Sequence, residues 1–141
     1  MNRILIDSDV ILDVFLNRIP FAKFSAQILS LCDLKLIKGF ITPVICSNLY
    51  YILRKSKTHK DVIALLKELI SITDILIIDK EVIIDSINSD FQDFEDSMQH
   101  FAAYRSNNIE LIITRNIVDY RKSLIPVLTP ELFLKQRIST N

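Results

Sequence analysis

Glycine is almost absent from this sequence, which contains Gly39 and no other glycine among 141 residues. Gly-rich phosphate-binding loops need several glycines, because only a backbone without side chains can approach a phosphate closely. Neither a P-loop nor a dinucleotide-binding fingerprint can be built from this chain. The sequence therefore argues against the usual kinds of nucleotide-cofactor chemistry.

Cysteine is also scarce, and both cysteines, Cys32 and Cys46, lie inside apolar segments. Two cysteines do not make a disulfide framework, and a thiol in an apolar segment is most simply a small buried side chain. We therefore expect two buried thiols without a structural disulfide role.

Neither sign of charge is in excess, because 17 Lys and Arg residues balance 17 Asp and Glu residues. A neutral chain gives no argument from composition for binding nucleic acid. The charges are nevertheless uneven along the chain, since residues 54–60 are basic and residues 90–96 are acidic. The basic segment is either a solvated helix end or loop, or a surface that holds a phosphate backbone beside an acidic site.

Long hydrophobic runs are missing too, because charged residues interrupt each run before the roughly 18 residues that a membrane span requires. The N-terminal residues lead directly into a strand pattern and lack the small-residue cleavage site of a signal peptide. We therefore expect a cytoplasmic protein with no membrane partner. Half of the residues are hydrophobic, and the length suits one compact domain, residues 1–141.

Short runs of branched apolar residues alternate with longer segments whose apolar residues recur at helical spacing. The predicted strands are 3–7, 40–42, 74–79, 110–114 and 125–128. The predicted helices are 9–17, 20–37, 43–55, 58–72, 80–88, 94–106 and a terminal helix from Pro130, and we expect Gly39 to end the second helical segment. This alternation predicts an α/β fold, a three-layer α/β/α sandwich with a mainly parallel central sheet of four to five strands.

Acidic side chains follow the ends of predicted strands at both ends of the chain. Asp7 follows the first strand directly, Asp93–Asp96 opens a helix, and Asn116 and Asp119 follow the strand that ends at Thr114. Ligands of open α/β sheets bind beyond the carboxyl ends of the strands. At an effective dielectric near 20, two like charges about 4 Å apart repel by about 4 kcal/mol, so several acids at such a mouth suggest a divalent metal.

Each of these acids also has a simpler explanation. Ser8 or Asp9 could cap a helix, and Asp79 is most simply a cap as well. The acids of 93–96 could be ordinary first-turn residues that favour the helix dipole. Asp13, six residues beyond Asp7 on a helix, is expected at the surface or as a secondary contact.

The histidines and tyrosines give weaker indications. His100 follows Asp96 by four residues, so the two share a helix face and could form a metal pair, although a surface or interface position is the simpler expectation. Tyr50, Tyr51 and Tyr104 are most simply core or interface residues.

Four segments in the correct order resemble the PIN-domain family of small metal-dependent ribonucleases, and in particular its VapC-like toxins. These segments are Ile4–Asp13, Asp93–Asp96 followed by Ala102-Ala103, Leu111–Asn116 followed by Asp119-Tyr120, and Ile125–Leu134. The resemblance covers nearly the whole chain.

The resemblance implies a set of site residues. Asp7 and Asp96 would be metal ligands, and Asp119 or Asn116 would complete the far side of the site. The family often places an acid on the helix after its second strand, and Asn48 stands at that position. An amide oxygen can bind a metal but brings no charge. The implied cofactor is Mg²⁺ or Mn²⁺, with Asp7, Asp96, Asp119 and Asn48 as ligands and with catalytic roles for Asp7, Asp96, Asp119 and Asn116.

The resulting hypothesis is an endoribonuclease that cuts single-stranded or loop RNA, with Ser8, Thr114 and Arg115 contacting the substrate. The resemblance further implies a toxin held inactive by an antitoxin protein and a homodimer, for which Phe21, Phe24, Tyr50 and Tyr51 are candidate contacts. Two alternatives stay open. Asn48 and the neutral charge favour a catalytically weak or inactive module that binds RNA or protein, and fold analogy alone allows a metal hydrolase acting on small phosphate esters.

Overall fold

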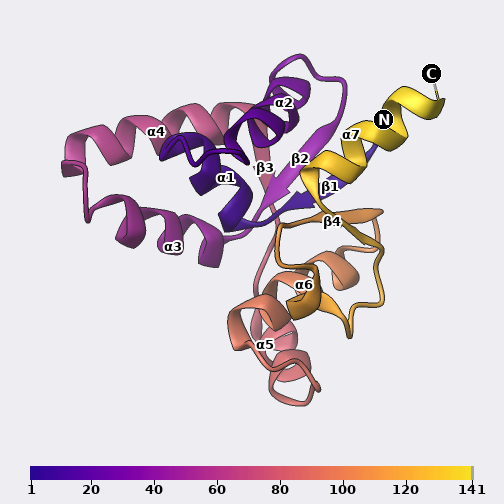
Figure 1. Cartoon of the computed structure of the whole chain (residues 1–141). Coiled ribbons are helices and arrows are strands. Elements are labelled where there is room, and N and C mark those ends of the chain that lie inside the picture. The colour runs from indigo at the N-terminus through magenta and orange to yellow at the C-terminus, as the bar shows by residue number, and fades with distance from the viewer. Residues whose placement is uncertain (141) are drawn as a thin grey trace.

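A single parallel sheet forms the centre of the molecule in the computed structural model, which describes residues 1–140 (Figure 1). Asn141, the last residue of the predicted domain, lies outside the described residues. The strand order is β3-β2-β1-β4-β5, and each neighbouring pair is parallel. The strands are β1 (Arg3–Ile6), β2 (Lys38–Ile41), β3 (Thr73–Ile75), β4 (Leu111–Ile113) and β5 (Val127–Leu128).

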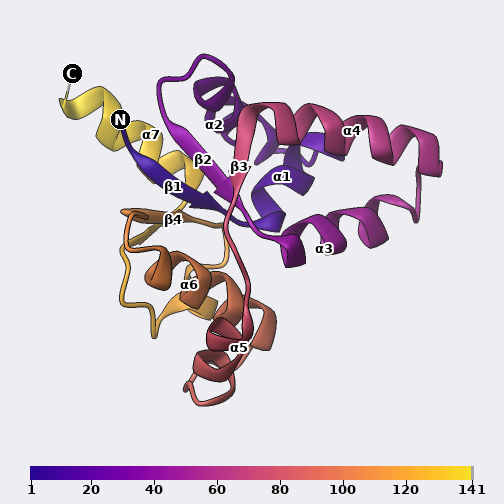
Figure 2. The same ribbon diagram turned by 180° about the vertical axis from the view of Figure 1, so that it is seen from behind.

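Helices cover both faces of this sheet, as the two opposite views show (Figures 1 and 2). One layer contains α1 (Ser8–Phe15), α2 (Ala22–Asp33) and α7 (Pro130–Thr140); the other contains α5 (Lys80–Ile87) and α6 (Phe94–Ser106). Helices α3 (Pro43–Leu53) and α4 (His59–Ile72) form a pair that projects to one side, and a 3₁₀ helix, η1 (Ile117–Tyr120), follows β4. The predicted three-layer α/β/α sandwich is therefore confirmed.

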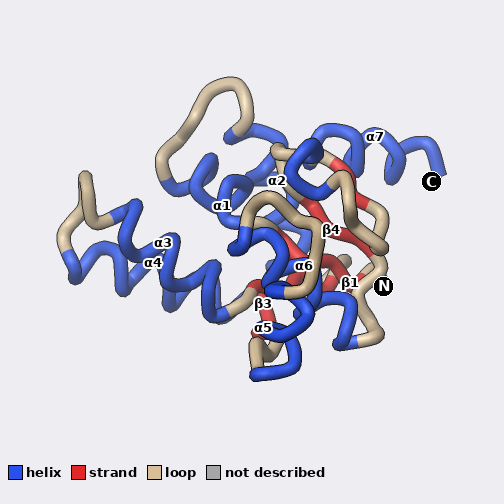
Figure 3. The backbone as a smooth tube through the Cα atoms, turned by 90° about the horizontal axis from the view of Figure 1, so that it is seen from below, coloured by secondary structure: helices blue, strands red, loops and turns tan. Residues whose placement is uncertain are grey.

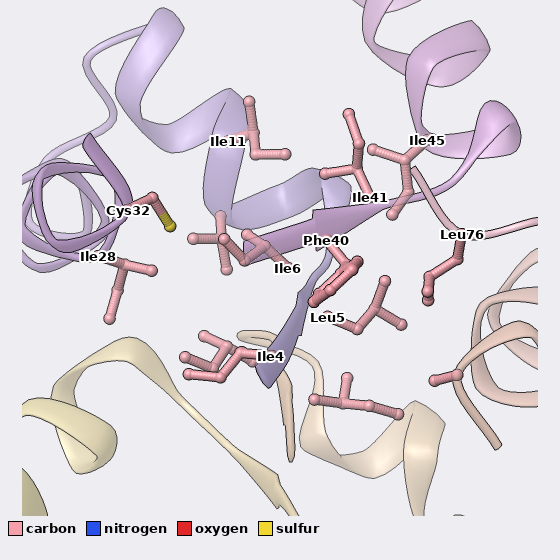
Figure 4. Close-up of a cluster of buried hydrophobic side chains, with 14 of the residues drawn as sticks. Ile4, Leu5, Ile6, Ile11, Ile28, Cys32, Phe40, Ile41, Ile45 and Leu76 are labelled. Atoms are coloured by element: carbon pink, nitrogen blue, oxygen red, sulfur yellow. The ribbon is translucent and has the colours of Figure 1, made fainter. Parts of the chain in front are cut away.

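The central strand β1 is buried on both faces because helices cover it from each side. Ile4, Leu5 and Ile6 are fully buried. Successive side chains of a strand point to opposite faces, and Figure 4 shows Ile6 on the side of Cys32 and α2, whereas Leu5 lies with Phe40 on the other side. A run of branched apolar residues in the sequence therefore becomes a strand shared by two cores.

The prediction that Gly39 ends a helix is wrong. Helix α2 ends at Asp33, and Lys35 reverses the chain with a left-handed backbone (φ 60°). Gly39 lies inside β2, where an added Cβ atom would come within 2.7 Å of Cys32 Sγ and 3.0 Å of Ile6 Cδ1. The glycine is needed because α2 packs so closely on the sheet at this point.

Other boundaries are shorter than the sequence pattern suggested. The predicted strand 74–79 ends at Ile75, and the chain then leaves the sheet toward α5 (Figure 2). Ile77 is 73% exposed, so its apolar character does not mark a buried strand. The predicted helix 20–37 shortens to Ala22–Asp33, whereas the predicted helix 94–106 matches α6 at both ends.

The two thiols are free, with Cys32 buried and Cys46 half-buried. Burial raises the pKa of the Cys32 thiol to about 11. Within residues 1–140, none of the helices combines the length and the apolar character needed to cross a membrane.

Candidate active site

The strand order places Asp7 at the switch point of the sheet, where the strands on one side of β1 (β2, β3) precede those on the other side (β4, β5) in the chain. β1 lies between β2 and β4, and Ile6 of β1 is paired with Ile113 of β4. Asp7 and Thr114 therefore leave neighbouring strands at the same edge. Ligands of open parallel sheets bind at such a switch point, so this edge is the natural place for a site.

Asp7 is held by three hydrogen bonds at the start of α1. Its Oδ1 accepts the Ser8 N–H at 2.8 Å, so Asp7 itself caps the helix. Its Oδ2 accepts the Thr114 hydroxyl at 2.9 Å and the Tyr120 hydroxyl at 3.3 Å. Burial, followed by the negative charge of Asp9, nevertheless raises the pKa of Asp7 to about 7. The pocket orients this carboxylate but does not neutralise it.

Asp9 is a second carboxylate of this site, and the sequence reasoning treated it only as a possible cap. Its Oδ2 accepts the Arg115 backbone N–H at 3.1 Å and the Thr114 hydroxyl at 3.3 Å. Its Oδ1 is buried and has no hydrogen-bond partner. Burial raises the pKa of Asp9 above its ordinary value. The signal available in the sequence was its position two residues beyond Asp7 at the same strand end.

Asp96 lies in the first turn of α6, where Asp93 caps the helix by accepting the Asp96 N–H at 3.0 Å. Burial, followed by the negative charges of Asp7, Asp93 and Asp119 in that order of size, raises the pKa of Asp96 to about 8. A hydrogen bond with Tyr120 acts in the opposite direction. Asp7 and Asp96 are therefore close enough for each charge to affect the other.

Tyr120 joins these two carboxylates and was not singled out from the sequence. Its ring is 2% exposed, and its hydroxyl donates to Asp7 and also forms the hydrogen bond that lowers the pKa of Asp96. Because the hydroxyl carries one proton, it can donate to only one carboxylate at a time. Burial and the nearby carboxylates raise its own pKa well above the usual value, so it stays protonated.

The 3₁₀ helix η1 brings Asp119 to the rim of this site. Asp119 is exposed, and its negative charge raises the pKa of Asp96. Asn116, also exposed, positions the turn through its backbone: its N–H donates to the Thr114 hydroxyl at 3.1 Å, and its carbonyl accepts the Asp119 N–H at 3.1 Å. Asp119 is thus close enough to the half-buried Asp96 for its charge to act on it.

Asn48 of α3 contacts α6 one residue before Asp96. Its Nδ2 donates to Glu95 Oε2 at 2.7 Å, and Glu95 is the neighbour of Asp96 in α6. The helices are joined again at the start of α3, where the buried Thr42 hydroxyl donates to Gln99. The amide oxygen is the atom of Asn48 that could take part in binding a cation.

Asp13 was expected at the surface or as a secondary contact, and the surface position is wrong. Asp13 is fully buried and accepts two hydrogen bonds from Arg115, at 2.5 Å from Nε and 3.0 Å from Nη2; Arg18 lies 3.7 Å away. The guanidinium that was predicted to contact substrate is therefore held by Asp13. It also lies over the Phe21 ring, 3.9 Å from its centroid.

The expectation that His100 lies at a surface or interface is also wrong. His100 is fully buried, and its Nε2 accepts the Leu124 N–H at 2.9 Å, so that nitrogen is already used. Its ring packs against Phe91 and Phe101. Burial lowers the pKa of His100 to about 4, which keeps the ring neutral. The histidine ties α6 to the segment after η1.

The donor set of this acidic centre suits a hard divalent cation, because all its candidate ligands are oxygens. No group of three or more His, Cys, Asp or Glu side chains in residues 1–140 is arranged closely enough to hold a metal ion as it stands. The raised pKa values of Asp7 and Asp96 and the unpartnered Asp9 Oδ1 nevertheless show negative charge that the protein leaves uncompensated. A cation is the group that would compensate it.

Solved structures with the same fold come from several bacteria. VapBC2 of Rickettsia felis, bound to a promoter DNA fragment, contains a chain that is 12% identical with a TM-score of 0.68, covering 90% of this chain and 98% of its own. VapBC-1 of nontypeable Haemophilus influenzae gives 14% identity, a TM-score of 0.66, and coverage of 92% and 98%. VapC20 of Mycobacterium tuberculosis, a toxin that cleaves the sarcin-ricin loop, gives 13%, 0.60, and 77% and 86%. At these identities, the likeness shows the fold.

A comparison with curated protein sequences finds no match. The family model described as PIN domain matches residues 3–118, which include Asp7, Asn48 and Asp96. The resemblance carried by the sequence motifs is thereby confirmed, and the chain belongs to the PIN-domain family.

Proposed function

We propose that this protein is a metal-dependent endoribonuclease that cleaves phosphodiesters in single-stranded or loop RNA. The observation that carries the proposal is the pairing of Asp7 and Asp96 through the Tyr120 hydroxyl at the switch point of the sheet. Two carboxylates kept close together, with raised pKa values, are typical of a site that works with a bound cation. The family model and the similarity to VapC20 support nuclease activity.

The residues of the acidic centre have distinct roles in this proposal. Asp7 and Asp96 would hold Mg²⁺ or Mn²⁺, with Asp119 and the Asn48 oxygen completing the ligands. A divalent ion bound there would lower the pKa of a water molecule and offset charge on the phosphodiester. Thr114 fixes the orientation of Asp7, and Tyr120 keeps Asp7 and Asp96 together. Both hydroxyls therefore preorganise the site.

RNA is the substrate that this arrangement favours. Unstacked strands can enter a site at a sheet edge, whereas a base-paired helix presents its scissile bonds less freely. The exposed Asn116 would help Asp119 to complete the far side of the site, and the basic segment 54–60 could hold flanking phosphates.

A protein partner is part of the proposal. The similar structures include VapBC2 and VapBC-1, and VapC20 is a toxin. We propose that this chain is likewise a toxin, that it forms a homodimer in the cytoplasm, and that an antitoxin protein binds it there and keeps it inactive.

The decisive variant is Asp96→Asn. We expect it to abolish Mg²⁺- or Mn²⁺-dependent cleavage of a single-stranded RNA, by at least about a hundredfold, because it removes one of the three carboxylate charges that would hold the cation. The matched control is Asp61→Asn, since Asp61 occupies the same position in α4, with its N–H donating to the cap residue Thr58.

The measurements are RNA cleavage with metal and with EDTA, and circular dichroism to show that the fold is intact. Cleavage by Asp96→Asn at the wild-type rate would remove Asp96 from the mechanism. Cleavage that persists in EDTA would remove the metal.

One observation favours a second candidate function. Asn48 occupies the position where the family often has an acid, and its amide nitrogen is bound to Glu95. A site with one charge fewer binds a cation less tightly, so the chain could bind RNA or a protein partner without cutting. RNA binding without any metal-dependent cleavage would support this candidate and contradict the nuclease.

A further inference from the structure

A cavity lies beside the acidic centre, between the N-terminal ends of α2 and α7. Its volume is about 320 Å³, which suits a ligand of the size of one nucleobase rather than a long peptide. Pro20, Phe24 and Pro130 give it apolar walls, and Phe21 contributes an aromatic ring that is 40% exposed. Figure 3 shows the two helices close together next to β4.

Ser25 is the residue that indicates a ligand. It lines this cavity from α2, is fully buried, and its hydroxyl has no hydrogen-bond partner. Buried hydroxyl groups are nearly always paired, because leaving one unpaired is unfavourable. Its donor and acceptor capacity is therefore available to a molecule bound in the cavity.

Arg115 connects the cavity to the acidic centre. Its backbone N–H donates to Asp9, and its guanidinium lines the cavity over the Phe21 ring. The two hydrogen bonds to Asp13 use Nε and Nη2, so the hydrogens on Nη1 are not committed to Asp13. The cavity and the acidic centre thus lie on two sides of one residue.

We propose that this cavity binds an unstacked nucleobase of the RNA whose phosphodiester lies at the acidic centre. The Phe21 ring offers a face for stacking, as aromatic side chains do in proteins that bind single strands. Arg115 can donate hydrogen bonds to a base edge, Ser25 can donate or accept, and the Glu131 carboxylate can accept. The charge of Arg115 is already offset by Asp13, and a phosphate group would gain nothing from the apolar walls, so a base is the part of the substrate that fits.

This inference rests on the proposed RNA substrate, and the experiment below distinguishes failure of the base pocket from failure of the proposed nuclease activity. The probe is a fluorescein-labelled hexaribonucleotide, compared with versions in which one nucleotide at a time is abasic. Binding is measured by anisotropy in Ca²⁺, with a gel to verify that the probe stays intact. We expect one abasic position to weaken wild-type binding by about tenfold, which is the size of effect seen when one stacking contact is removed.

Phe21→Leu keeps apolar volume and removes the aromatic face. We expect the variant to bind the intact probe about tenfold more weakly than the wild type does. Its affinity should not fall further with the abasic probe that weakens wild-type binding, because the two changes remove the same contact. The matched control is Tyr104→Leu, since Tyr104 is a similarly exposed aromatic residue in the last turns of α6 and should leave binding unchanged.

Ser25→Ala tests the same cavity independently of the Phe21 ring. It should keep or raise the melting temperature, because it removes an unpaired buried hydroxyl, and should weaken binding about threefold. Equal binding by wild type, Phe21→Leu and Ser25→Ala, or a flat abasic series, overturns the base pocket. If cleavage remains metal-dependent in that case, the nuclease stands. If the wild type shows the abasic effect but never cleaves, the pocket stands and the nuclease falls.

Discussion

At the scale of single residues, the site is defined by negative charge that the protein does not balance. The pKa of Asp7 is raised to about 7 and that of Asp96 to about 8, mainly by burial. A carboxyl group with a raised pKa is more easily protonated in the folded protein than in the unfolded chain. A bound cation would also stabilise the folded protein, because its positive charge would take the place of the proton.

The first residue-scale prediction concerns pH. The folded protein binds more protons at Asp7 than the unfolded chain does between about pH 4 and about pH 7, so the contribution of Asp7 to the free energy of unfolding decreases as the pH rises through that range. Without metal, Asp7→Asn should therefore differ little from the wild type at pH 4, where Asp7 is protonated in the folded state and largely so in the unfolded chain, and should be more stable than the wild type at pH 8, by a few kcal/mol. Urea denaturation in EDTA at both pH values measures this difference.

The difference in the free energy of unfolding between Asp7→Asn and the wild type does not include the effects of other groups that titrate equally in both proteins. His100, whose pKa is lowered to about 4, destabilises both proteins equally when the pH falls below about 6.5. Saturating Mg²⁺ should raise the stability of the wild type at pH 8 and have less effect on Asp7→Asn. A variant that is less stable than the wild type at pH 8 in EDTA would contradict the argument.

The second residue-scale prediction concerns Asn48. Asn48→Glu should tighten Mn²⁺ binding by about tenfold, because it adds a charged oxygen ligand, and should lower the melting temperature in EDTA, because the new carboxylate meets Glu95. Calorimetric titration and thermal melts measure the two effects. Asn108→Glu, an exposed loop substitution away from the site, is the control. No gain in affinity would place Asn48 outside the metal site.

At the scale of elements, α1 is joined to the segment after β4 by the buried pair Asp13 and Arg115. Asp7 also caps the start of helix α1, so both ends of the helix are fixed relative to the strands of the site. Similarly, His100 joins α6 to the segment after η1 through the Leu124 N–H. These links position the acids although they are not themselves part of the metal chemistry.

The element-scale prediction is that Asp13→Ala destabilises the protein by about 3 kcal/mol, because it leaves the largely buried Arg115 without its partner. Chemical denaturation is the measurement. Asp33→Ala, at an exposed acid that ends α2, should change stability by less than about 0.5 kcal/mol. If the double variant Asp13→Leu, Arg115→Met is no more stable than Asp13→Ala, the unpaired charge is not the cause.

At the scale of the whole molecule, the α3–α4 pair projects from the sheet and carries an aromatic side chain in the open. Tyr51 is 70% exposed, and its ring touches that of Tyr50. Large exposed aromatic side chains are enriched where proteins associate. With Phe21 and Phe24 assigned to the cavity beside the site, Tyr51 becomes the best candidate for the dimer contact among the residues first considered.

The whole-molecule prediction is that the protein elutes as a dimer by light scattering at micromolar concentration and that Tyr51→Glu shifts it to a monomer, because a charge at the centre of an apolar contact is strongly unfavourable. Tyr104→Glu should leave the mass unchanged. A monomeric wild type over the same concentration range would contradict the homodimer.

Local signals in the sequence were sufficient for many of the elements. The start of the helix 94–106 was predicted correctly because Asp93 and the residues after it form a capping pattern that acts within one turn. The strand 3–7 was predicted within one residue because its apolar run is uninterrupted. The motif order also indicated Asp7, Asp96 and the family, since these depend on neighbours along the chain.

Only the tertiary structure revealed the roles of Gly39, Asp13 and Tyr120. Gly39 is required by the approach of α2 to β2. Asp13 is buried against Arg115, which follows the neighbouring strand β4. Tyr120 lies between two carboxylates that are distant in sequence. None of these contacts has a local signature, because each joins segments whose spacing along the chain carries no information about their distance in space. The sequence by itself determined the elements and their order, whereas burial and long-range pairing decided which polar groups act together.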